Sequence, residues 1–236
     1  MTKENYKECL EVVKKCYHEI KPYVGVAYDS SGRNGLMLVG ESHYLCEATK
    51  CDISPDAWYR GDSAASLSPC DKEWINTSKI LTLRISEDFR NHPRNIWKKI
   101  AEEIASALPA CEYRSIFERV YSNVVAFNYF VRPVVGIQSI KRDLTELDME
   151  VSALRFQDLI RRFRPRAVIV LSSLVACYVD GTELQKNGIA YLNTPHPASH
   201  WWNRCAKKYG DKDHEGRRGR DLIAPFIKCL NLRWGA

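Results

Sequence analysis

The sequence predicts an α/β fold in which a mostly parallel sheet is covered by helices on both faces. Short aliphatic runs alternate along the chain with segments whose apolar residues recur every three to four positions, as strands alternate with helices in such folds. Two of these runs stop abruptly at polar residues, one at Glu41 and the other shortly before His196. Loops that leave the carboxyl ends of parallel strands gather at one edge of the sheet, so we expect these two segments to share a site.

In the first half of the chain we expect two helices, one strand and one irregular insertion. Residues 3–20 and 93–108 carry apolar side chains at helical spacing, and Pro93 suits the first turn of the second helix. Residues 36–39 form an uninterrupted apolar run, which is typical of a buried parallel strand. Residues 45–74 show no clear periodicity, so we expect an irregular insertion there, close to the site.

In the second half of the chain, three further strands complete a sheet of four strands. The strands are expected at residues 120–127, 167–171 and 189–192, and helices at residues 149–163, 172–179 and 218–231. The run at 167–171 is the clearest buried strand, because it holds five aliphatic residues without interruption.

The composition indicates one intracellular domain without a membrane span. The chain has 236 residues and is 45% hydrophobic, which is enough for one core, so we expect a single domain over residues 1–236. No apolar stretch approaches the ~20 residues that a bilayer-crossing helix needs, and the first residues are charged. Nine cysteines, an odd number, favour reduced thiols over a disulfide framework. We therefore expect a monomer in the cytoplasm or associated with the nucleoid.

The net charge of +6 is concentrated near the C-terminus. Residues 201–236 hold nine Lys and Arg residues against four acids. Such a patch beside a site favours a phosphate backbone as the partner, and the alternative is a solvated basic face without a partner. The candidate DNA contacts within it are Arg204, Lys207, Lys208, Arg217 and Arg218.

The order of the polar strand ends resembles that of the uracil-DNA glycosylase superfamily. The chain has, in order, a strand ending at Gly40, a strand ending at Asn128, the aliphatic strand at 167–171, and a strand followed by His196-Pro197-Ala198-Ser199. The resemblance covers about residues 36 to 202. It implies a three-layer α/β/α fold with a short, mostly parallel, four-stranded sheet. It also implies a DNA glycosylase, an enzyme that flips one base out of the stack before it acts on it.

The first polar loop, residues 41–44, departs from the best-known branch of that superfamily, which reads Gly-Gln-Asp-Pro-Tyr. Ser42 occupies the Asp position, His43 occupies the Pro position and Tyr44 matches the Tyr. Glu41 and Glu47 instead fit the spacing of the iron–sulfur branch, which reads Gly-Glu-Ala-Pro-Gly. A carboxylate stabilises the oxocarbenium-like sugar of glycosidic cleavage, so Glu41 is the first catalytic candidate, with Ser42 or His43 as the water ligand. The alternative is that Glu41 caps a helix N-terminus.

The resemblance assigns the recognition of the flipped base to Asn128. An amide offers one acceptor and two donors, which suits the Watson–Crick edge of a base, and Asn123 is the rival position. An aromatic side chain stacked on the base completes such pockets. Tyr44, Tyr129 and Phe130 are the candidates for that stacking.

His196 matches the superfamily histidine that donates a hydrogen bond to the departing base. Members of the superfamily follow this histidine with a loop that enters the minor groove and fills the vacated space. His200, Trp201 and Trp202 occupy that stretch here and are expected to contact DNA. The alternative is that the two Trp residues belong to an ordinary core.

No cofactor is expected, because hydrolysis of the bond between base and sugar requires none. The iron–sulfur branch binds its cluster through four cysteines, but this chain lacks a Cys-x-x-Cys pair. A zinc site at His43, Cys46, Cys51 and Cys70 is the metal alternative, although the spacing is poor for a zinc finger or knuckle.

The sequence therefore predicts a DNA glycosylase that excises uracil or a modified pyrimidine, including bases of the kind that phages use. Repair and defence against foreign DNA both remain open as its biological role. Two alternatives also remain open. One is a catalytically weak DNA-binding module of the same fold, suggested by the missing Asp. The other is a Ser hydrolase that uses Ser42, with Asp211-Lys212-Asp213-His214 supplying the acid–His pair.

Overall fold

The structure is a computed structural model of the chain. It describes residues 2–29, 31, 34–91, 95–109, 115–136, 139–209, 216–232 and 234. Within these residues the main sheet has five strands in the order β1-β4-β2-β6-β7. The strands are β1 (Tyr23–Val24), β2 (Leu36–Gly40), β4 (Val124–Asn128), β6 (Ala167–Val170) and β7 (Ala190–Asn193). β1 pairs antiparallel with β4, and the other neighbours are parallel.

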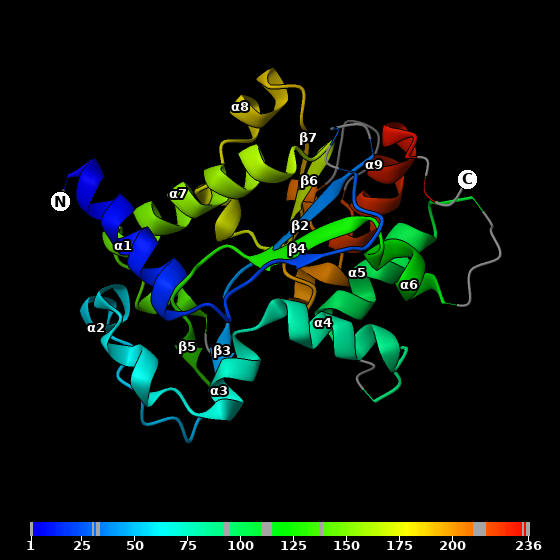
Figure 1. Ribbon diagram of the computed structural model, residues 1–236. Coiled ribbons are helices and arrows are strands. Elements are labelled where there is room, and N and C mark those ends of the chain that lie inside the picture. Colours follow the sequence, from blue (N-terminus) through cyan, green and yellow to red (C-terminus); the bar gives the residue numbers. More distant parts are fainter. Residues whose placement is uncertain are drawn as a thin grey trace.

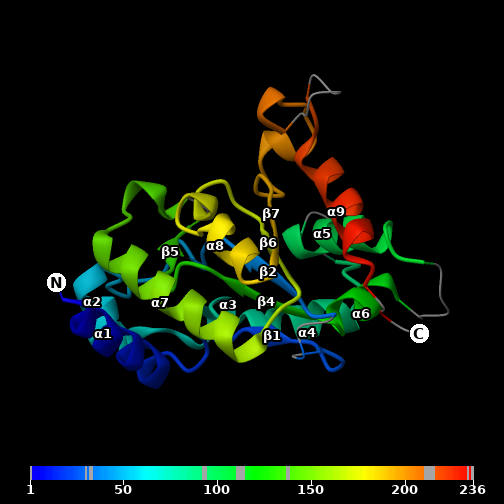
Figure 2. The same cartoon turned by 90° about the horizontal axis from the view of Figure 1, so that it is seen from above.

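Helices cover both faces of this sheet, as Figures 1 and 2 show. One face packs against α4 (Thr77–Ser86), α5 (Ile96–Ala105), α6 (Ile116–Tyr121) and α9 (Ile223–Leu230). The other face packs against α7 (Glu146–Phe163) and α8 (Gly181–Lys186), with α1 (Lys3–Cys16) lying outside α7. The prediction of an α/β fold with a mostly parallel sheet is confirmed.

The buried strands divide their side chains between the two layers because successive residues of a strand point to opposite faces. In β2, Leu36 and Leu38 join the core with α5 and α9. Met37 and Val39 join the core with α7 and α8. All four side chains are fully buried, which explains why this strand reads as an uninterrupted apolar run rather than an alternating one.

The prediction of four strands is wrong, because β1 adds an antiparallel edge strand. The chain also forms a separate two-stranded parallel sheet from β3 (Tyr44–Leu45) and β5 (Val134–Val135). Each of these additional strands has only two residues, too few to show a periodic pattern in the sequence.

The prediction that residues 45–74 are irregular is also wrong. This insertion contains α2 (Pro55–Arg60), a 3-10 helix η1 (Asp62–Ser66) and α3 (Pro69–Trp74). The two α-helices each begin with a Ser-Pro pair, with the proline in the first turn. A proline fits there because the N–H it lacks has no partner within the helix. The insertion and α1 share a third apolar cluster, which includes Trp58 and Tyr17.

Several predicted boundaries need correction. The helix expected at 3–20 ends at Cys16, and the one expected at 93–108 begins at Ile96, where the Asn95 side chain caps it. Pro93 lies outside the described residues. The strand expected at 120–127 begins at Val124, since residues before 122 complete α6.

The C-terminal half needs similar corrections. The helix expected at 149–163 begins three residues earlier, at Glu146. Residues 172–179 hold only the 3-10 helix η3 (Val175–Cys177), because the Ser172 hydroxyl accepts the N–H groups of residues 174 and 175 in a tight turn. The segment 218–231 is divided into η6 (Gly219–Leu222) and α9. The other short helices are η2 (Ile140–Arg142), η4 (His200–Trp202) and η5 (Lys207–Tyr209).

None of the helices in the described part of the chain combines the length and the apolar character that a bilayer crossing requires.

Candidate functional site

The carboxyl ends of the parallel strands carry polar side chains that meet at one edge of the sheet. Glu41 follows β2, Asn128 ends β4, Ser172 lies just beyond β6, and His196 follows β7. Ser172 donates a hydrogen bond to Glu41, and the negative charge of Glu41 acts on the pKa of His196. The two polar loops are therefore within electrostatic range of each other, although more than 150 residues separate them in the sequence.

Glu41 is buried and both of its carboxylate oxygens accept hydrogen bonds from hydroxyl groups. Ser139 Oγ donates to Oε1 over 2.8 Å, and Ser172 Oγ donates to Oε2 over 2.6 Å. Glu41 lies between β2 and β3 rather than at the start of a helix, so the helix-capping alternative is wrong. The two hydroxyls fix the carboxylate in one orientation.

His196 is held as a neutral imidazole that can donate a hydrogen bond from Nε2. The backbone N–H of Ala198 donates to His196 Nδ1 over 3.2 Å. A backbone N–H can only donate, so Nδ1 has to be the acceptor and the ring proton lies on Nε2. Burial lowers the pKa of His196 below its ordinary value; the negative charge of Glu41 opposes this shift and the positive charge of Lys99 adds to it. Lys99 is placed there by its hydrogen bond to the carbonyl of Pro197.

His43 is also buried and neutral. Asn128 Nδ2 lies 3.2 Å from His43 Nδ1 and serves as its donor. Burial, together with the charge of Arg155, lowers the pKa of His43 to about 3, and the carbonyl of Trp74 acts in the opposite direction. Nε2 of His43 has no partner in hydrogen-bond geometry.

The side chain of Asn128 is engaged inside the protein at two points. Its amide nitrogen bonds His43, and its Oδ1 lies against Gly40, where a Cβ would overlap it. The structure therefore places Asn128 as a residue that positions His43. The rival position Asn123 precedes β4 at the opposite edge of the sheet and donates to the carbonyl of Arg119.

Of the three aromatic candidates for base stacking, only Tyr44 stands beside Glu41. Burial and then the negative charge of Glu41 raise the pKa of Tyr44. The hydroxyl of Ser42 is close to this phenol but has no partner in hydrogen-bond geometry. The backbone N–H of Phe130 donates to the carbonyl of Glu41 over 2.9 Å, and that of Tyr129 donates to Gly40. The two side chains, however, are buried in the core with α7, edge-to-face with each other.

The segment that follows His196 exposes two of its three predicted DNA contacts. Trp201 is 48% exposed and His200 is also exposed, whereas Trp202 is only 2% exposed and belongs to the core with α9. For Trp202 the structure therefore favours the alternative of a core residue. Figure 2 shows the described residues between β7 and α9, largely in orange, projecting from the body of the molecule. We call these residues, 194–209 and 216–222, the projecting segment.

The basic residues of this projecting segment that are predicted to contact DNA differ in their exposure and in their ion pairs. Arg204, Lys207 and Lys208 are exposed, and the Lys208 ammonium lies 4.6 Å from the centre of the Tyr209 ring. Arg218 is half-buried and forms an ion pair with Asp221 over 2.7 Å. The backbone of Arg217 pairs with that of residue 206.

Within the described residues, no group of three or more His, Cys, Asp or Glu side chains is arranged to hold a metal ion. The candidate zinc ligands have other surroundings. Cys51 is buried and donates to the carbonyl of Ser63, Cys46 and Cys70 are exposed, and His43 Nδ1 is bonded to an amide.

Two residues of the site were not anticipated from the sequence. Ser172 directly follows the buried strand β6, so the rule that selected Glu41 at the end of β2 also selects Ser172. Ser139 follows the two-residue strand β5 and is the N-cap residue of η2; β5 is too short to be recognised in the sequence, so no sequence signal marks Ser139. Conversely, Asp211, Asp213 and His214, which belong to the Ser hydrolase alternative, lie outside the described residues.

Acid is expected to destabilise the fold through His43. The unfolded chain binds a proton on this residue below its ordinary pKa of 6.5, whereas the folded protein does not bind it until about pH 3. The free energy of unfolding should therefore fall by up to about 1.4 kcal/mol per pH unit as the pH decreases from 6 to 4. Urea unfolding at several pH values measures this slope. The slope of the free energy of unfolding against pH should become shallower in His43→Gln but not in the exposed control His18→Gln. Equal slopes in the wild type and both variants would show that His43 is not the residue whose protonation destabilises the fold.

No known family model matches the sequence, and no curated protein is similar enough to it to be matched.

Proposed function

We propose that the protein is a DNA glycosylase that hydrolyses the bond between a pyrimidine base and its sugar. The observation that carries the proposal is the pairing of His196, a neutral Nε2–H donor, with the fixed carboxylate of Glu41 at the same edge of the sheet. This is the pair of groups that heterolytic cleavage of a glycosidic bond requires, because negative charge grows on the base while positive charge grows on the sugar.

In the proposed reaction the electrons of the C1′–N1 bond leave with the base. His196 Nε2–H donates a hydrogen bond to the base oxygen on which the negative charge collects, and the Glu41 carboxylate faces the oxocarbenium-like sugar. Water then adds to C1′ and gives up a proton, which neutralises the base anion, and the products are a free base and an abasic sugar. The hydroxyls of Ser139 and Ser172 hold the carboxylate in place throughout.

The contacts of the first polar loop support a rebuilt base pocket and thus a modified pyrimidine as substrate. Asn128 is the residue expected to recognise the Watson–Crick edge of the base, but its amide nitrogen donates a hydrogen bond to His43. Ser42 Oγ and His43 Nε2 are buried polar atoms without a partner in hydrogen-bond geometry, and the groups that interact with these two side chains are the Tyr44 phenol and the Trp74 carbonyl. Buried polar atoms are costly unless they are hydrogen-bonded, so a polar substituent on the substrate is a fitting partner for them.

The alternatives lack this support. The Ser hydrolase alternative pairs Ser42 with His214, which lies outside the described residues, and no described histidine is a hydrogen-bond partner of Ser42 Oγ. A DNA-binding module without turnover would not need a neutral histidine donor beside a fixed carboxylate.

The test is a screen of oligonucleotides, single- and double-stranded, that carry uracil, thymine or a 5-substituted pyrimidine with a hydroxyl or amino group. Alkali cleavage of the product reveals an abasic site. We expect strand cleavage, with a preference for a substituted base over uracil. Release of no base at all would reduce the protein to a binding module, and equal rates on uracil and every substituted base would contradict the rebuilt pocket.

The affinity for undamaged duplex DNA is expected to fall steeply with salt because of the projecting segment. Replacement of Arg204, Lys207 and Lys208 by Ala should flatten the slope of log affinity against log salt by ~2–3 units, since each phosphate contact contributes ~0.9. Fluorescence anisotropy with a labelled duplex at several salt concentrations measures this slope.

The matched control removes three exposed lysines elsewhere on the surface, Lys7, Lys50 and Lys186. Both triple variants lose the same charge, so a general electrostatic effect would flatten both slopes equally. That outcome would show that the projecting segment is only a solvated basic surface.

A further inference from the structure

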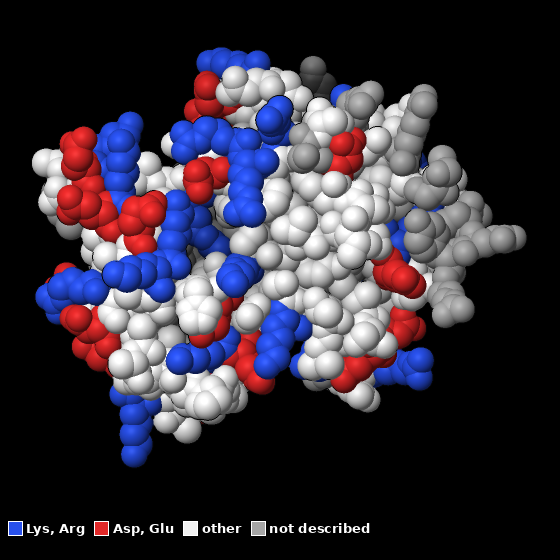
Figure 3. Space-filling view, viewed as in Figure 1, with Lys and Arg blue, Asp and Glu red and all other residues white. Residues whose placement is uncertain are grey.

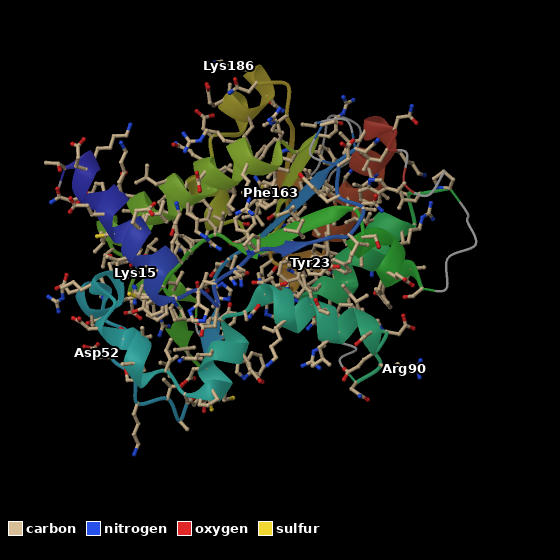
Figure 4. All side chains as sticks on the ribbon, viewed as in Figure 1. Lys15, Tyr23, Asp52, Arg90, Phe163 and Lys186 are labelled. Carbon is tan, nitrogen blue, oxygen red and sulfur yellow. The ribbon has the colours of Figure 1, made fainter. Side chains whose placement is uncertain are left out.

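A groove between α1 and α7 gathers positive charge on the face of the molecule that Figure 3 shows. Its basic lining residues, which define the α1–α7 groove, are Lys14, His18, Lys21, Arg155 and Arg162. Asp158 is the acidic residue among its lining. In Figure 4, Lys15 and Phe163 mark the C-terminal parts of the two helices that form it.

Arg155 lies at the base of this groove as a buried cation without a carboxylate partner in the described structure. It is only 7% exposed, and its guanidinium donates to the backbone carbonyls of Asn128 (2.9 Å) and Ile20 (3.3 Å). The guanidinium also lies 5.5 Å from the centre of the Phe127 ring. Burial lowers its pKa to about 10. A buried charge with only neutral partners is costly, and an anion nearby would offset that cost.

The remaining charges of the groove leave this positive charge unbalanced. Asp158 is already engaged, because it lies 3.5 Å from Lys14 and 3.6 Å from Arg161. His18 is close to a neighbouring glutamate. Lys21 and Arg162 are exposed, and neither forms an ion pair within the described residues, although the Arg162 guanidinium lies over the Phe163 ring.

We infer that the α1–α7 groove is an anion site that binds a phosphate group through Arg155, Lys21 and Arg162. The planar fork of an arginine matches the oxygens of a phosphate, and a lysine ammonium adds a mobile point charge beside it. The inference does not rest on the proposed glycosylase activity, because Lys21 and Arg162 are exposed lining residues of the groove and not part of the Glu41–His196 site. Arg155 lies between the two regions, since it donates to the carbonyl of Asn128 and its charge acts on His43. The phosphate can come from a small phosphorylated molecule or from a nucleic acid backbone.

Isothermal titration of the full chain with pyrophosphate, and separately with a short single-stranded oligonucleotide, tests the inference. The double variant Lys21→Ala, Arg162→Ala should weaken binding of the occupying probe by ~10–100-fold, as expected for the loss of two charge-assisted contacts. Both replaced side chains are exposed, so the fold should be retained. Arg155→Lys, which keeps the charge but removes the fork, should weaken binding as well.

The matched control is Lys15→Ala, Arg166→Ala, which removes the same charge from exposed positions that do not line the groove. It should change the affinity by less than ~3-fold at physiological salt, where distant surface charges are screened. Binding of pyrophosphate that the oligonucleotide does not displace assigns the groove to a small phosphorylated ligand, and mutual displacement assigns it to a nucleic acid backbone. Equal losses in the two double variants, or saturable binding of neither probe, would overturn the inference.

Discussion

Replacement of His196 by Ala is expected to slow base excision by ~10²–10³-fold, while binding of DNA changes only a few-fold. The imidazole is fixed by the N–H of Ala198 so that Nε2–H is available as a donor. In the proposed reaction this donor acts chiefly when charge has developed on the leaving base, so its loss should lower the rate of chemistry more than the affinity. Single-turnover excision with saturating enzyme measures that rate directly.

The control for this variant is His200→Ala, which removes an exposed imidazole from the same segment. It should leave the single-turnover rate within a few-fold of wild type. Glu41→Gln keeps the hydrogen-bonding shape but removes the negative charge, and it should slow excision as well. Unchanged rates in both His196→Ala and Glu41→Gln would refute the assignment of the two loops to one catalytic site.

The pH dependence of excision gives a second readout of His196. Burial lowers its pKa, Glu41 opposes this, and Lys99 adds to it, so the neutral donor should persist below pH 6.5. Protonation of His196 at Nδ1 would also direct this new N–H against the backbone N–H of Ala198, and this repulsion disfavours the imidazolium form. The single-turnover rate should therefore stay level through pH 6.5 and decline only at lower pH.

The fold could be predicted from the sequence where a segment is long and buried on both sides. The sequences of β2 and β6 show no alternation of apolar and polar residues, because neighbouring side chains are buried equally on opposite faces of the sheet. Leu38 and Val39 in β2, and Ile169 and Val170 in β6, are examples. The prediction failed where tertiary packing decides the structure of a short segment. β1 exists only because its two residues pair with β4. The helices of the insertion carried a local signal, two Ser-Pro starts, that the search for periodicity overlooked.

The site could be predicted in part because the strands that carry it are visible in the sequence. Glu41 and His196 were selected because they follow strand ends, and parallel strands bring such residues together. The direction of individual side chains could not be predicted. Trp201 and Trp202 are adjacent in sequence, yet the turn of η4 exposes the first and buries the second. The contact between Asn128 and His43 depends on the close approach of β4 to Gly40, which only the sheet register reveals.

A buried ion pair fastens the insertion and the loop after β4 to the N-terminus of α7. Asp148 is 0% exposed and accepts two hydrogen bonds from Arg132, at 2.8 and 2.7 Å. It also accepts hydrogen bonds from the Tyr59 hydroxyl in α2 and from the backbone and hydroxyl of Thr145. Burial alone would raise the pKa of Asp148, but the hydrogen bonds and charge of Arg132 outweigh it and the pKa is lowered. The stability that this pair contributes is therefore present at neutral pH and is lost as the pH falls through that lowered pKa.

Replacement of Asp148 by Ala is expected to lower the free energy of unfolding by about 3–5 kcal/mol. It leaves the Arg132 guanidinium buried without a counter-charge. It also removes the acceptor for Tyr59 and for the N–H and hydroxyl of Thr145, the N-cap residue of α7. Chemical denaturation at pH 7 measures the loss. The matched control on the same helix is Asp158→Ala, whose ion pairs with Lys14 and Arg161 lie at the surface and should contribute less than about 1 kcal/mol. Equal free energies of unfolding for the two variants would contradict the view that the buried Asp148–Arg132 pair holds the insertion against the loop after β4.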